Sequence, residues 1–242
     1  MRFALAFLLA GAIARADTLS DLKARLSSSA DTTAVTATVS YVSSRLGQKS
    51  AEAPPRPATV VATDGPDGFQ MCWARDVIRP AMQAGQKEDE RRRGARAAMD
   101  GLKPTEIYDY LNIASSIMEV LNNAEVTEEK SDTWQGRPAR RLALKLTLPL
   151  SEKDRKYIKE MSADATVWLD EEGWPLAAER RLHIKGRAML VISFEQKESE
   201  RFEFGRVAGR LVTLRHEKSS EGSGGGESGG RKTVATLEVA QL

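Results

Sequence analysis

The stretch Arg141–Leu148 (RLALKLTL) decides the fold, because leucine occupies every second position in it. Charged, small or polar residues stand between the leucines. An alternation with a period of two residues is typical of a β-strand that buries one of its faces. The apolar face of such a strand has to be covered by other parts of the chain.

Further strands are predicted on both sides of this stretch from alternation and from turn residues such as Asp64–Gly68 (DGPDG). They cover residues 32–44, 58–63, 69–77, 124–130, 132–134, 165–170, 175–185, 188–197, 201–207, 210–219 and 232–239. Short turns between consecutive strands, with Gly186-Arg187 and Ala208-Gly209 among them, favour an antiparallel meander. The glycine-rich segment Glu221–Gly230 (EGSGGGESGG) is predicted to be a flexible loop.

Four helices are predicted, at residues 18–29, 80–101, 104–122 and 151–161. The helix at 104–122 has the clearest apolar stripe, whereas the helix at 80–101 is heavily charged. We therefore expect an α+β fold: a curved antiparallel β-sheet, or incomplete barrel, covered on its concave face by a few helices. Residues 17–242 are expected to form this single domain.

The N-terminus is predicted to be a secretory signal peptide over residues 1–16. Arg2 precedes an apolar run from Phe3 to Ile13, and Ala14-Arg15-Ala16 offers small residues for cleavage after Ala16. An uncleaved signal anchor is the alternative, although the apolar run is short for a membrane span. We expect a periplasmic, exported protein.

The composition disfavours several classes of function. Without the two signal-peptide arginines the chain carries 34 basic and 34 acidic residues, so nucleic-acid binding is not expected. Cys72 is the only cysteine and cannot form an internal disulfide. Two histidines and one cysteine make a dedicated transition-metal site improbable, and no cofactor is expected.

The residues that could carry catalysis show no arrangement of base, nucleophile and orienting group. His183 is predicted to be a solvated strand residue, and His216 to be partly buried without an implied partner. Cys72 is predicted to be a buried, inert thiol. We therefore do not expect an enzyme, although a hydrolase with an unrecognised site is kept as a third hypothesis.

One dense basic cluster lies in the charged segment and consists of Arg91, Arg92, Arg93 and Arg96. Pairing with the acidic residues beside it on a solvated helix face is one interpretation. A patch that contacts anionic lipid or an acidic partner is the other.

Two stretches resemble a known family: Asp132–Leu146 (DTWQGRPARRLALKL) and Ala165–Leu176 (ATVWLDEEGWPL). They are similar to segments of the periplasmic lipoprotein-carrier and outer-membrane lipoprotein-sorting proteins of the LolA/LolB type. The resemblance implies an incomplete barrel capped by helices, with a hydrophobic cavity for acyl chains. The segments 80–101 and 221–230 are not features of these carriers, and no functional residue is carried over.

The leading hypothesis is a non-enzymatic, monomeric binding protein for lipid or a lipidated polypeptide. It requires a cavity on the apolar side of the sheet, and the sequence leaves a cavity and a packed core equally open. Candidate lining residues, chosen for apolar periodicity, are Val39, Tyr41, Ile107, Leu111, Met118, Leu144, Leu146, Val191 and Phe204. The alternative is a regulatory or assembly module that binds a protein partner, such as a membrane or envelope protein.

Overall fold

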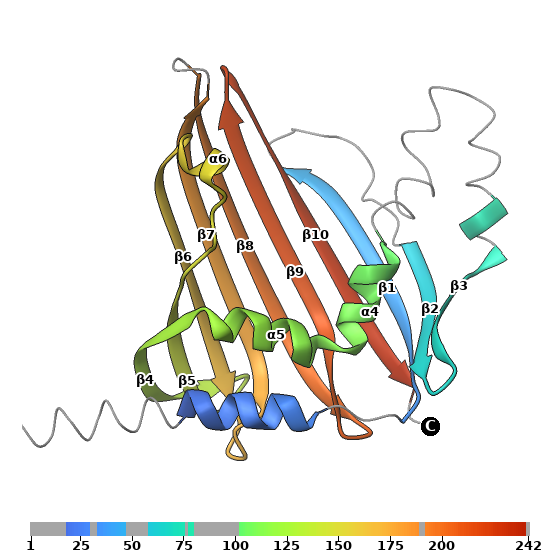
Figure 1. The fold of residues 1–242 in the computed structure, drawn as a ribbon. Helices are drawn as coiled ribbons and strands as arrows, with labels where there is room; N and C mark the ends of the chain where they lie inside the picture. The colour runs from blue at the N-terminus through green and yellow to red at the C-terminus, as the bar shows by residue number, and fades with distance from the viewer. Residues whose placement is uncertain are drawn as a thin grey trace, which may run out of the picture.

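The computed structural model describes residues 18–29, 33–46, 58–75, 77–79, 102–188 and 192–240. Several predictions fall outside these ranges: the signal peptide 1–16, the helix 80–101 with Arg91, Arg92, Arg93 and Arg96, and the candidate lining residue Val191. Elements carry the labels of Figure 1.

A ten-stranded antiparallel sheet makes up most of the described chain, in the order β3-β2-β1-β10-β9-β8-β7-β6-β5-β4. The strands are β1 (Val35–Leu46), β2 (Ala58–Gly65), β3 (Gly68–Trp73), β4 (Ala124–Trp134), β5 (Arg137–Leu146), β6 (Ile158–Leu169), β7 (Pro175–Ala188), β8 (Ile192–Val207), β9 (Arg210–Gly224) and β10 (Glu227–Ala240). Strands β3 and β4 are the two edges, so the sheet does not close into a barrel. The expected antiparallel sheet with a few helices is thus present in its general form.

Helices cross one face of this sheet, here called the helix-bearing face (Figure 1). They are a helix at residues 18–28, α4 (Pro104–Leu111), α5 (Ile113–Asn122) and the short α6 (Glu152–Arg155). In Figure 1, α4 and α5 cross the lower part of the sheet, and the upper ends of β6 to β10 extend beyond them. Among the described residues, no helix has the length and apolar character needed to cross a bilayer.

Two apolar clusters lie between the helices and the sheet. The first contains Ile107 and Leu111 of α4 together with inward-facing residues of β1, β2 and β10 such as Val39. The second contains Leu22 and Leu26 of the N-terminal helix with the leucines of β5 and residues of β6 and β8. The strict leucine alternation of β5 therefore does bury one face, as the sequence predicts: Leu142, Leu144 and Leu146 are all buried.

The glycine-rich segment Glu221–Gly230 is not a loop, and that prediction was wrong. It forms the end of β9 and the start of β10, joined by a turn at Gly225-Gly226 in which both residues have positive φ. A two-residue turn of this kind fits the twist of a hairpin and favours glycine. Phe194 of β8 pairs with Gly224, and Leu46 of β1 pairs with Gly230. Strand pairing on both sides therefore overrides the low intrinsic strand preference of glycine.

The predicted turn at Gly186-Arg187 was also wrong, because β7 continues through Gly186 to Ala188 and pairs with β8 up to Ile192. The gap predicted at residues 198–200 is likewise absent, and β8 is one long strand over Ile192–Val207. The predicted helix at 151–161 is shortened to α6, because Ile158 already belongs to β6. In each case pairing with a neighbouring strand decides the outcome.

The predicted helix at 104–122 is divided into α4 and α5 at Asn112. Asn112 has φ −133° and ψ 40°, outside the helical region. Its side-chain amide donates hydrogen bonds to Asp64 Oδ2 at 2.9 Å and to the Tyr108 carbonyl at 3.1 Å. These contacts hold the break and turn α5 away from the direction of α4.

A candidate binding pocket between the N-terminal helix and α5

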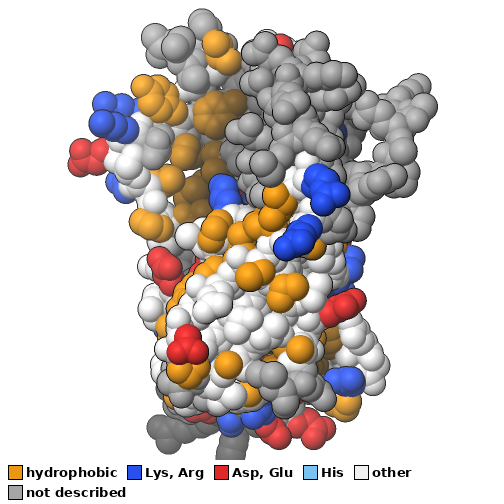
Figure 2. Space-filling view, turned by 90° about the vertical axis from the view of Figure 1, so that its right-hand side faces the viewer, with side chains coloured by type: hydrophobic (Ala, Val, Ile, Leu, Met, Phe, Trp, Pro, Cys, Tyr) orange, Lys and Arg blue, Asp and Glu red, His pale blue; other side chains and the backbone are white. Residues whose placement is uncertain are grey.

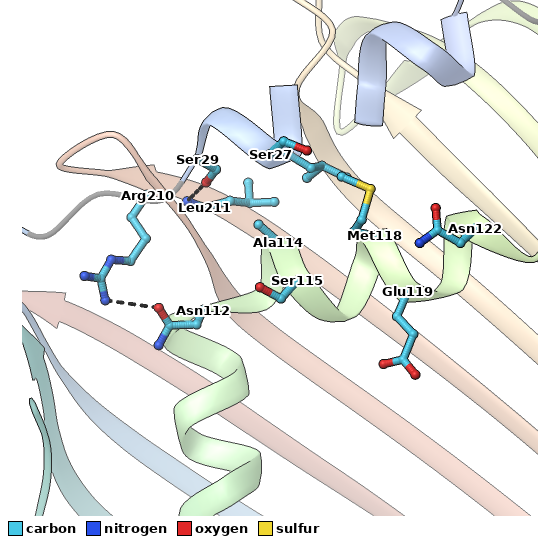
Figure 3. A pocket seen from close by; sticks show the side chains of 11 residues that line it. Ser27, Ser29, Asn112, Ala114, Ser115, Met118, Glu119, Asn122, Arg210 and Leu211 are labelled. Carbon is cyan, nitrogen blue, oxygen red and sulfur yellow. Dashed lines mark hydrogen bonds between the residues drawn. The ribbon is translucent and has the colours of Figure 1, made fainter. Parts of the chain in front are cut away.

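A pocket of about 500 Å³ lies between the helix at residues 18–28, helix α5 and the start of β9 (Figure 3). Its volume falls within the range of small-molecule sites, about 300–1,000 Å³. The lining residues come from three segments of the chain and are Leu26, Ser27, Ser29, Asn112, Ala114, Ser115, Met118, Glu119, Asn122, Arg210 and Leu211.

The lining combines apolar and polar side chains. Leu26, Ala114, Met118 and Leu211 are apolar, and Leu26 and Leu211 also belong to the buried second cluster. Serine, asparagine, glutamate and arginine side chains complete the lining, with Ser115, Glu119 and Asn122 exposed along α5. The pocket therefore offers apolar contact continuous with the core and hydrogen-bonding groups at its margin.

A buried polar cluster fixes one end of the pocket. Arg210 Nη1 donates to Asp64 Oδ2 at 2.6 Å and to Asn112 Oδ1 at 3.3 Å, while its Nη2 donates to the Thr33 carbonyl at 3.1 Å. Arg210 is 5% exposed. Arg210 stands at the start of β9, and its guanidinium binds β2, the break between α4 and α5, and the segment before β1. These charge-assisted hydrogen bonds hold this end of the pocket in place.

A second contact joins the N-terminal helix to the sheet at the same place. The backbone N–H of Leu211 donates to Ser29 Oγ at 3.1 Å, and Ser29 is buried (Figure 3). The end of the N-terminal helix is thereby held beside β9. The two walls of the pocket are thus tied to the same strand, one through Ser29 and the other through Asn112 and Arg210.

The helix-bearing face also carries a row of charged side chains across β7, β8 and β9. Glu200 Oε2 contacts Arg180 Nη2 at 2.6 Å, and Glu200 Oε1 contacts Lys218 Nζ at 3.0 Å. Glu198 contacts the same two cations, at 3.3 Å and 3.0 Å. Burial alone would lower the pKa of Lys218, but its contacts with Glu198 and Glu200 outweigh burial and raise that pKa.

His216 lies beside this row and is mostly buried. Its Nδ1 is 2.9 Å from the Tyr110 hydroxyl, and its ring stacks on Phe202 at 4.2 Å. Its Nε2 is buried without a hydrogen-bond partner among the described residues, 3.9 Å from Glu200 Oε1. Burial lowers the pKa of His216, and burial raises the pKa of Tyr110 above its usual value. The sequence predicts the partial burial of His216 but not its partner Tyr110.

The candidate lining residues are mostly core residues rather than pocket residues. Of the candidates that the structure describes, only Met118 lines the pocket. The first cluster contains Val39, Ile107 and Leu111, with Tyr41 packed against it, and the second contains Leu144, Leu146 and Phe204. Periodicity identifies which residues face inward but does not show where a void is left between elements.

The pocket residues that sequence reasoning missed come mainly from outside the predicted strands. Leu26 continues the helical spacing of Leu19 and Leu22 within the predicted helix 18–29, so its burial was foreseeable although its place in a pocket was not. Arg210 follows the predicted turn at Ala208-Gly209 and gave no signal in the sequence of a contact with Asp64, which is 146 positions away.

The residues considered for catalysis are spread over the sheet. Cys72 is exposed, which corrects the prediction of a buried thiol: Phe69, Met71 and Trp73 take the inward positions of β3. His183 on β7 contacts Glu195 at 2.7 Å and is half-exposed. Three strands separate β3 from β9, which carries His216. In the described part of the chain, no group of three metal-ligating side chains gathers.

No protein-family model matches the sequence, and neither does any curated protein. Among solved structures, the chain is similar to the crystal structure of MucB in complex with MucA(peri), at 11% sequence identity and a TM-score of 0.24. The match covers 91% of this chain and 94% of the other. A likeness at this level assigns neither a family nor a function to the chain.

Proposed function

We propose that this protein is an exported, non-enzymatic binding protein that takes an apolar chain of a lipid or lipidated polypeptide into the pocket between the N-terminal helix and α5. The observation that carries the proposal is the pocket itself, of about 500 Å³, with Leu26, Met118 and Leu211 on its walls. The proposal assigns the protein no catalytic residue and no cofactor. The proposed binding site is therefore the space between the N-terminal helix and α5, and not the apolar face of the sheet, where the sequence-based hypothesis placed it.

Burial of hydrocarbon supplies the binding energy in this proposal. Each methylene group removed from water contributes about 0.8 kcal/mol, so about six methylenes contribute roughly 5 kcal/mol. Met118 suits this role, because an unbranched thioether side chain adapts to ligands of different shape. The apolar wall continues into the second cluster, so the side of the ligand that faces this wall would be shielded from water.

The margin of the pocket would contact the polar part of the ligand. Ser27, Ser115 and Asn122 offer hydroxyl and amide groups, and Glu119 offers a carboxylate. The guanidinium of Arg210 is already bound by Asp64. The margin therefore favours a neutral or zwitterionic polar group, or a peptide backbone, over an isolated anion.

Native mass spectrometry of the protein purified from the periplasm tests this proposal directly, together with titration of a fluorescent long-chain fatty acid. We expect a co-purifying lipid and saturable probe binding. Absence of both would contradict the proposal.

A pocket-filling variant localises the binding. Ser115 is exposed on α5 and lines the pocket, so Ser115→Trp should fill it without disturbing the core. We expect at least a roughly tenfold loss of probe affinity, equivalent to about 1.4 kcal/mol. Thr105→Trp, at an exposed position of α4 away from the pocket, is the matched control and should bind the probe like the wild type.

A further inference from the structure

We propose that the free edge of β3 binds an extended segment of a protein partner by strand addition, in which the segment is uncharged along β3 and carries acidic residues at its N-terminal end. The inference is independent of the lipid pocket, because β3 contributes no lining residue to it. Strand addition supplies main-chain hydrogen bonds for affinity and uses alternate side chains for specificity.

The two edges of the sheet differ in how they are protected. On β4, Glu125, Glu128 and Lys130 are exposed, and the pairing with β5 has an irregularity between Val126 and Glu128. Exposed charges and bulges are features that keep sheet edges from pairing with other chains. The edge at β4 therefore discourages strand addition.

Strand β3 (GFQMCW) has none of these features. It carries no charged residue, and its pairing with β2 runs from Gly65↔Gly68 to Val60↔Trp73 without a register shift. No described strand pairs with its other side. An extended polypeptide satisfies the repeating N–H and C=O groups of such an edge, which identifies the chemical class of the partner.

The side chains next to this edge are uncharged on both faces, and Gln70 is the polar one among those of β3. Phe69 and Trp73 are partly buried on the helix-bearing face, and Phe69 packs edge-on against Tyr108 at 5.6 Å. Tyr108 is 44% exposed. On the opposite face Val61, which pairs with Cys72, is 42% exposed. The side chains of an added strand would meet uncharged and mostly apolar neighbours on either face, so charged residues are disfavoured along its length.

Charges flank β3 at its two ends. Asp67 lies in the turn before it, and Arg75 and Arg79 are exposed after it. A strand antiparallel to β3 begins next to Trp73, so acidic residues at its N-terminal end would lie near Arg75. Figure 2 views the molecule from the side on which β3 lies in Figure 1, and uncharged atoms with hydrophobic side chains cross the middle of the view, with Lys and Arg side chains above them.

The short length of β3 favours a peptide segment over a second copy of this chain. A stable protein–protein interface buries about 1,200–2,000 Å². A pair of six-residue strands falls well short of that area, although it is sufficient for a peptide that adds further side-chain contacts.

The test is binding of a fluorescent synthetic peptide of two aspartates followed by three valine–threonine repeats to the full-length mature protein. We expect saturable binding, with hydrogen-exchange protection of backbone amides in residues 69–73. A peptide with proline at alternate positions removes the required N–H groups, and we expect it to bind at least about tenfold more weakly.

Variants of the protein test whether the peptide binds at this edge or at another surface. Gln70→Glu with Cys72→Glu places two anions on exposed positions of β3, close to the acidic end of the bound peptide, and should lower peptide affinity at least about tenfold. Ser199→Glu, at an exposed position of the central strand β8, is the control of matching charge and should bind normally. Unchanged binding by the double variant, or protection outside β3, would overturn the proposal. If the wild type formed a concentration-dependent dimer and the double variant did not, the proposal would also be overturned, because β3 would then pair with a second copy of this chain.

Discussion

Among single residues, His216 has the clearest consequence for pH dependence. Burial lowers its pKa below the ordinary value of 6.5, with Lys218 and Arg180 acting in the same direction and Glu200 and Glu198 opposing them. The unfolded state therefore binds a proton at a higher pH than the folded state does. The stability contributed by neutral His216 is fully present above pH 6.5 and is lost as the pH falls from 6.5 towards the lowered pKa.

The variant His216→Gln removes this titration and keeps a group that can bond to Tyr110. We expect its free energy of unfolding to change less between pH 7.5 and 5.5 than that of the wild type, by up to about 1.4 kcal/mol, because only the pH unit below 6.5 contributes. Urea unfolding at the two pH values measures this difference. If the free energy of unfolding changed equally with pH in the two proteins, His216 would not titrate in this range.

At the scale of one element, β7 depends on a glycine in its interior. A Cβ at Gly186 would collide with the carbonyl oxygen of Tyr157 and with the ring of Phe194, its partner on β8. We expect Gly186→Ala to lower the free energy of unfolding by about 1–3 kcal/mol, the usual cost of overpacking. Denaturant unfolding monitored by circular dichroism measures the loss.

Gly229 on β10 is the matched control, since a Cβ there meets no atom within 4 Å and its φ is not positive. Gly229→Ala should change stability by less than about 1 kcal/mol. Equal effects of the two substitutions would mean that strand glycines act only through backbone entropy.

The elements that the sequence predicted well are those whose pattern is local. The alternation of Arg141–Leu148 and the turn at Asp64–Gly68 depend on neighbouring residues alone, and both are present. Glu221–Gly230 was mispredicted because its strands are held by β8 and β1, which lie far away in the sequence. The break at Asn112 was missed for the same reason, because Asp64 holds it.

The candidate site was less predictable than the fold. Met118 belongs to a helical apolar stripe, and that stripe identifies an inward-facing residue. The pocket also needs Leu26 and Leu211, from opposite ends of the chain, and a space left between two helices. Periodicity reports which side of an element is apolar, but a void depends on how far apart elements pack.

At the scale of the whole molecule, the charged edge at β4 should keep two molecules from pairing through that edge. We expect the triple variant Glu125→Thr, Glu128→Thr, Lys130→Thr to self-associate, because exposed charges on an edge strand oppose pairing between molecules. Size-exclusion chromatography with light scattering over a range of concentrations measures this. If the triple variant stayed as monomeric as the wild type, the irregularity between Val126 and Glu128, and not the charges, would protect this edge from pairing.

The pairing of β1 with β10 joins segments that are about two hundred positions apart in the sequence, from Thr36↔Ala240 to Leu46↔Gly230. Until the ribosome has released β10, the β1–β2–β3 unit has no neighbour on its inner side and cannot join the rest of the sheet. Such distant pairing makes folding slow. A chain that completes its sheet late stays unfolded for longer, and an unfolded chain is what the export proposed above would require.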